Sequence, residues 1–236
     1  MKKGLLILVA MVLSLGIMWQ DSVSADSHDE VWKSEEKDHK KAHGKADFFK
    51  SEAFLKYKAE ELGVEAEGKD AETLRKEVSE ASINQAAAEL GIETEGKEFK
   101  ELAKEIHHRK VMEKAEEMRI GTDGKEPEEL AKEVQEARVH QRADELGIST
   151  EGKDIETISK EVFETSVKHE ATILGIETED RELRDVHKEI QEVKLIQSAE
   201  QLRINTKDKD KQEIFDEIIT DHAEQAKKQQ LFPFDK

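Results

Sequence analysis

The sequence predicts an all-α fold, an elongated tandem array of helix-extended linker-helix units with a 28-residue repeat. Three observations predict it. A Gly-Lys or Asp-basic pair recurs every 28 residues, several apolar columns keep the same interval, and no glycine or proline interrupts the segments between these linkers. Because no insertion breaks the register, we expect about six units whose helices are shared between neighbours.

Residues 1–25 have the features of a secretory signal peptide. Two lysines precede an apolar run from Leu5 to Trp19, and small residues ending at Ala25 mark a cleavage position. The run is too short to favour a membrane span, and the chain has no cysteine to carry a lipid or form a disulfide. We therefore expect a secreted bacterial protein, extracellular or associated with the envelope, with no membrane span after cleavage.

Residues 26–45 are expected to be a flexible charged leader. His39 and His43 stand four residues apart beside Asp38, and side chains with this spacing on a helix can share a metal ion. A zinc site needs three or four fixed ligands, so we expect no metal here. A metal-binding leader is the alternative.

The helices of the array are expected within residues 46–230. A column of acidic residues suits helix N-termini, where carboxylates meet the positive end of the dipole, and Pro127 suits a first helical position. Helices should begin near residues 71, 99, 127, 155, 183 and 211. The acidic column consists of Asp70, Glu98, Glu126, Asp154, Glu182 and Asp210.

Glycines should end these helices. Gly91 followed by Ile92 is typical of a left-handed stop that folds the next side chain back onto the last turn, near Ala87. Each full repeat would then hold one helix of about 20 residues and a linker of about eight.

The apolar side of each helix changes halfway along its length. In the helix from residue 99, the first half is apolar on one side and the second half on the opposite side. Each helix should therefore serve two small cores, one with the preceding unit and one with the next. One such core is predicted from Ile83, Ala87, Leu90, Ile92, Phe99, Leu102 and Ile106.

Aromatic residues gather at both ends of the array. The first cluster, which we expect to cover the open face of the first unit, consists of Phe48, Phe49, Phe54, Leu55 and Tyr57. Residues 231–236 form a C-terminal tail that contains Leu231-Phe232-Pro233-Phe234. We expect this tail to pack on or fray from the last helix, with a docking peptide as the alternative.

The charge of the chain excludes some partners. A formal net charge of −18 with 40% charged residues makes nucleic acid and anionic membranes poor candidates, because both repel such a surface. Divalent cations, basic proteins and wall components remain possible partners.

One column of the linker carries a repeated positive charge. It consists of Lys69, Lys97, Lys125, Lys153, Arg181 and Lys209. This column is the candidate interaction site, since a row of cations could contact an anionic polymer. The alternative is that each cation is simply solvated among acidic neighbours.

The Gly-x-x-x-x-Gly-Lys pattern at Gly91 to Lys97 differs from a phosphate-binding loop. Glu98 stands where such a loop has serine or threonine, and a helix instead of a strand precedes it. The histidines after residue 100 fall in different repeat columns, and no serine or threonine is spaced to a histidine base. We therefore predict no enzyme activity and no cofactor.

The consensus A-x-E-L-G-I-x-T-x-G-K-x-x-x-x-L-x-K-E-I/V resembles the SAP-like helix-extended loop-helix motif and is similar to the N-terminal module of the Rho transcription terminator. The residues that match include Ala87, Leu90, Gly91, Ile92, Gly96, Lys97, Leu102 and Ile106, and again Ala143, Leu146, Gly147, Ile148, Gly152, Lys153, Ile158 and Val162. The resemblance implies the fold. It also implies DNA binding through Lys97 and Lys153, which the surrounding carboxylates and the secretion signal disfavour.

Together these observations predict a secreted, non-enzymatic repeat protein. It would act as a spacer or an interaction surface in the extracellular or envelope space, binding another protein or a wall component. A divalent-cation or metal-binding acidic protein is one alternative, and SAP-like nucleic-acid binding is another.

Overall fold

The computed structural model describes residues 48–235, and the predicted signal peptide and predicted leader lie outside this range. The described residues form one 3-10 turn, η1 (Phe48–Lys50), and eight α-helices, and contain no strand. The helices are α2 (Glu52–Glu61), α3 (Ala71–Glu89), α4 (Phe99–Glu117), α5 (Pro127–Glu145), α6 (Ile155–Leu174), α7 (Leu183–Gln201), α8 (Lys211–Asp221) and α9 (Ala223–Gln229). The predicted all-α array is therefore confirmed, and the helix starts match the prediction.

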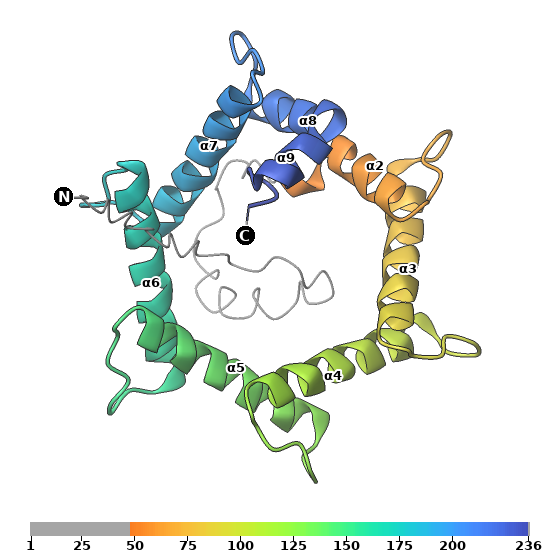
Figure 1. The fold of residues 1–236 in the computed structure, drawn as a ribbon, viewed down its shortest axis with the longest axis vertical. Helices are drawn as coiled ribbons and strands as arrows, with labels where there is room; N and C mark the ends of the chain where they lie inside the picture. The colour runs from red at the N-terminus through yellow and green to blue at the C-terminus, as the bar shows by residue number, and fades with distance from the viewer. Residues whose placement is uncertain (1–47, 236) are drawn as a thin grey trace, which may run out of the picture.

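Each helix contacts the next one along the chain, and α2 also contacts α8. The array therefore closes into a ring, with the linkers projecting outward and α9 lying against the inner side of α8 and α2 (Figure 1). The elongated shape that we predicted is corrected by this closure. The bend at every corner accumulates until the first and last helices meet.

The helix ends are built alike around the ring. After α3, Gly91 adopts φ 65° and the Ile92 N–H donates to the Ala87 carbonyl at 2.8 Å. This bond joins residues five positions apart across the last turn, as in a Schellman motif. The same bond follows α2, α4, α5, α6 and α7, from Val64, Ile120, Ile148, Ile176 and Ile204 to the fully buried Ala59, Ala115, Ala143, Ala171 and Ala199. The predicted stop and its contact with Ala87 are confirmed.

The corners hold the small cores that we predicted. In α4, Leu102 and Ile106 pack with α3, whereas Ala115 packs with Leu130 and Val134 of α5. The change of apolar side within one helix is therefore confirmed. The α3–α4 core contains all the predicted residues except Phe99, which is 44% exposed. Phe99 is the first residue of α4.

The largest core lies where the ring closes. We call it the seam, and it buries residues of η1, α2, α7, α8, α9 and the C-terminal tail. Phe48 stacks on Phe215 with ring centroids 5.3 Å apart, and Phe232 meets Phe48 edge-on at 6.2 Å. The N-terminal aromatic cluster thus covers the end of the first unit by packing against the last one. The tail also packs, since Leu231 and Phe232 are both buried.

The helix of the last repeat is shorter than predicted. It ends at Asp221 because His222 has φ −130°, outside the helical range, and α9 then leaves in a new direction. Helix α2 is equally short. Helix α8 has 11 residues and α2 has 10. Their combined length is therefore close to that of a full helix such as α3, which has 19 residues. The ring side at the seam is therefore one repeat helix split between the two ends of the chain.

Candidate functional site

Each cation of the linker column forms an ion pair with a glutamate eight residues later. The linker turn carries the cation back over the first turns of the following helix, where that glutamate lies. The Arg181 guanidinium contacts Glu189 at 2.6 Å. The remaining pairs are Lys69 with Glu77, Lys97 with Glu105, Lys125 with Glu133, Lys153 with Glu161 and Lys209 with Glu217.

These cations lie at different corners, so the fold does not bring them together into one patch. Their side chains are 25–32% exposed, and each charge is balanced within its own repeat. The column is therefore a repeated element of linker structure. Its binding to an anionic polymer stays a prediction.

The turn itself uses the backbone groups that a phosphate-binding loop would offer. Gly96 has φ 74°, and the Lys97 N–H donates to the Thr94 carbonyl at 3.3 Å. A positive φ at the third position is typical of a type II turn, which favours glycine. Since Lys97 N–H already has a partner, it is not offered to a ligand.

Acidic side chains stabilise the N-termini of the helices. The Asp70 carboxylate accepts hydrogen bonds from the backbone N–H groups of Glu72 and Thr73 at 2.9 and 3.0 Å. The bond from Thr73 is the main cause that lowers the Asp70 pKa. Asp154 is held in the same way by Thr157, and its pKa is also lowered. This agrees with the predicted role of the acidic column at these aspartates, whereas Glu126 and Glu182 make no side-chain hydrogen bond at their helix starts.

We call the outer surface formed by the linkers the rim. It comprises residues 62–70, 90–98, 118–126, 146–154, 175–182 and 202–210. Its acidic side chains are exposed, while the column cations are half-buried and paired. The rim therefore carries exposed carboxylates at every corner, and at the corner of residues 202–210 these stand beside the exposed cations Arg203 and Lys207.

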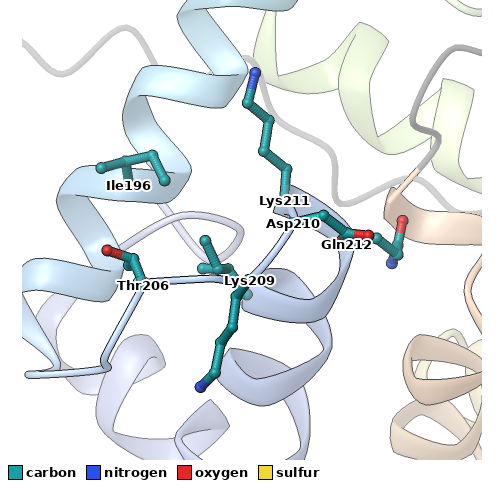
Figure 2. Close-up of a pocket in the computed structure, with 7 residues that line it drawn as sticks. Ile196, Thr206, Lys209, Asp210, Lys211 and Gln212 are labelled. Atoms are coloured by element: carbon teal, nitrogen blue, oxygen red, sulfur yellow. The ribbon is translucent and has the colours of Figure 1, made fainter.

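A shallow hollow of about 570 Å³ lies at the corner of α7 and α8. Ile196 forms its apolar wall, and Thr206 and Gln212 line its edges. Lys209 and Lys211 also line it but point away from each other (Figure 2). Lys209 pairs with Glu217 and Lys211 with Glu192, so the two cations do not converge on a common ligand.

The seam contains polar contacts that sequence reasoning missed. The Lys227 ammonium contacts the Glu61 carboxylate at 2.8 Å and lies 5.0 Å from the centre of the Tyr57 ring. The hydrogen bond from Lys227 lowers the Glu61 pKa. Burial alone would lower the Lys227 pKa, but its bonds to Glu61, Tyr57 and Glu224 raise it overall.

A second polar contact holds the tail against α6 and α7. Lys194 contacts Asp235 at 2.5 Å and Glu170 at 2.9 Å. A signal for the seam was present in the sequence. Lys227 occupies a repeat position that is alanine in every other repeat. Gln230 occupies a repeat position that is leucine or methionine in every other repeat.

The alternative prediction of a metal-binding protein finds no support in the described residues. Between residues 48 and 235, no group of three or more His, Asp or Glu side chains is arranged to hold a metal ion. The leader histidines, His39 and His43, lie outside the described residues. Within the same range, none of the helices combines the length and apolar content needed to cross a bilayer.

Comparisons with known proteins give no relative. No protein family matches the chain, and no curated protein and no solved structure matches it.

Proposed function

We propose that the protein is a secreted, non-enzymatic ring that acts as an interaction surface in the extracellular or envelope space. The observation that carries this proposal is the repeated geometry of the rim. Every corner has the paired cation, and the first four corners share the turn hydrogen bond and an exposed acidic residue two positions before the cation, so the rim offers several similar sites to one partner. A partner with repeated cationic groups, either a protein or a wall component, fits this surface.

The closure favours an interaction surface over a spacer. A spacer separates what is attached to its two ends. Here Phe48 and Phe232, near the two ends of the described chain, lie in one core with their rings 6.2 Å apart. An array whose ends meet cannot hold two attached groups apart along its length.

The SAP-like resemblance supports the helix-linker-helix fold but not its DNA-binding role. SAP-like recognition would use Lys97 and Lys153, and both are engaged by glutamates of their own repeats. A contact with phosphate would have to displace those carboxylates and approach a rim of like charge. We therefore keep SAP-like nucleic-acid binding as the alternative to the proposed role as an interaction surface.

The test is retention of envelope proteins and wall fragments by residues 26–236 immobilised on a support. The rim variant replaces Glu67, Glu95, Asp123, Glu151 and Glu179 with the corresponding amides. The control variant replaces an equal number of exposed helix carboxylates, Glu60, Glu113, Glu116, Asp144 and Glu200. We expect a retained component that is lost with the rim variant and kept with the control. Equal retention by both variants would contradict a role for the rim.

A further inference from the structure

The seam follows the repeat register. Six repeats of 28 residues separate Phe54 from His222, so both occupy the same repeat position. Helix α8 ends at Asp221, one residue before this position. Helix α2 supplies the second half of the split helix, and residues 222–229 would fill that place if α8 continued straight.

Residues 222–229 are unsuited to form the second half of the split helix. Residue 227 falls in the column where alanine is otherwise fully buried in every repeat, and it is Lys227. Residue 230 falls in the leucine and methionine column, and it is Gln230. Burying a lysine and an amide without partners is unfavourable. The helix therefore breaks at His222, and α8 is left with an acceptor surface for a separate helix.

Helix α2 has the residues that this acceptor requires. Ala59 is fully buried at the alanine position, Leu62 stands at the leucine position, and Val64 donates its N–H to Ala59 at 2.7 Å. Phe48, Phe54 and Tyr57 add aromatic contacts with the seam. The donor, residues 48–64, and the acceptor thus lie at opposite ends of the chain and are complementary.

We propose that the seam is an exchangeable junction, and that α8 of one chain also accepts the donor segment of a second copy. Complementary ends of one chain can pair between two chains with the same contacts, which is the basis of domain swapping. Residues 65–70 of the linker are the hinge, and Gly68, with φ 75°, provides its backbone freedom. Within one chain the effective concentration of the donor is on the order of mM, so the single-chain ring is the species expected in dilute solution.

The experiment refolds residues 26–236 from denaturant at about 10 μM and about 1 mM, spanning the effective concentration. Mass is then measured by light scattering after size-exclusion chromatography. We expect a species of twice the monomer mass whose fraction rises with the refolding concentration. Two Ser79→Cys pools, labelled with a donor or an acceptor dye and refolded together, should show energy transfer in that species. A monomer at every concentration would overturn the proposal.

One double variant locates the exchange at the seam. In the double variant Lys227→Ala with Gln230→Leu, residues 222–229 can continue α8 and compete with the donor segment for the acceptor surface. The dimer fraction should fall in this variant, and an unchanged fraction would also count against the seam.

Discussion

Arg119 and Gly91 occupy the same repeat position, and substitutions at the two sites should change stability in opposite directions. Both residues follow a helix in the left-handed region, with φ 59° for Arg119 and 65° for Gly91. A side chain in this conformation costs roughly 1–2 kcal/mol, while glycine costs about 0.5–1 kcal/mol more chain entropy on folding. Arg119→Gly should therefore stabilise the fold by about 0.5–1 kcal/mol.

Gly91→Ala should destabilise the fold by about 1 kcal/mol. A Cβ at this glycine would meet no atom within 4 Å, so the expected loss comes from the backbone conformation and not from a clash. Arg203→Gly, at φ 61°, repeats the first substitution at another corner, and its effect should add to that of Arg119→Gly because the two sites share no contact.

The measurement is urea unfolding of residues 26–236 followed by far-UV circular dichroism. A shift in the midpoint at constant slope reports stability, whereas a changed slope would indicate that corners unfold separately. Stabilisation by Arg119→Gly with destabilisation by Gly91→Ala is the expected pair of results. A neutral Gly91→Ala or a destabilising Arg119→Gly would refute the left-handed helix stop as the cause.

Three further predictions concern single side chains. Phe215→Ala should cost about 3–5 kcal/mol because it empties the seam core, and Phe99→Ala, at an exposed site, should change stability by no more than about 0.5 kcal/mol in thermal melts. Glu105→Gln should cost no more than about 1 kcal/mol in urea, since its pair with Lys97 is partly exposed, and a larger loss would show that the linker depends on this pair. The pKa of Glu61 is lowered by its hydrogen bond from Lys227, so its contribution is present above the ordinary carboxyl pKa of about 4.3 and is lost as the pH falls through the lowered value. The melting temperature should therefore fall more steeply below about pH 5 in the natural chain than in Glu61→Gln, and parallel curves would contradict this linkage.

The features that the sequence predicts well are those set within one or two repeats. Asp70 and Asp154 accept hydrogen bonds at helix starts, and Gly91 ends a helix as expected, because each depends on backbone groups only a few residues away. The two cores of each helix also follow from one repeat, since the apolar side of α4 changes between Ile106 and Ala115. Local periodicity carries this information directly.

The ring closure could not be predicted in the same way. It depends on the bend at each corner, and a small bend repeated around the array decides whether the ends meet. The ion pair of Lys97 with Glu105 was missed for a related reason, because it depends on the direction in which the linker turn returns its side chain. Phe99 was misplaced because its apolar character fits the core pattern, although the preceding helix does not cover it. Lys227 in an otherwise alanine column was the one local sign that the last repeat differs.

The distribution of the core around the ring follows from the split helix. At the α4–α5 corner Ala115, Leu130 and Val134 form a small buried core, with partly buried apolar side chains packed against it, and a peptide linker joins the two helices. At the seam no peptide bond joins α8 to α2, so packing alone must balance the entropy of bringing the chain ends together. The seam therefore needs the largest core, and it has one that includes Phe48, Phe215 and Phe232. The aromatic residues at both ends of the sequence thus take the place of the covalent connection that every other corner has.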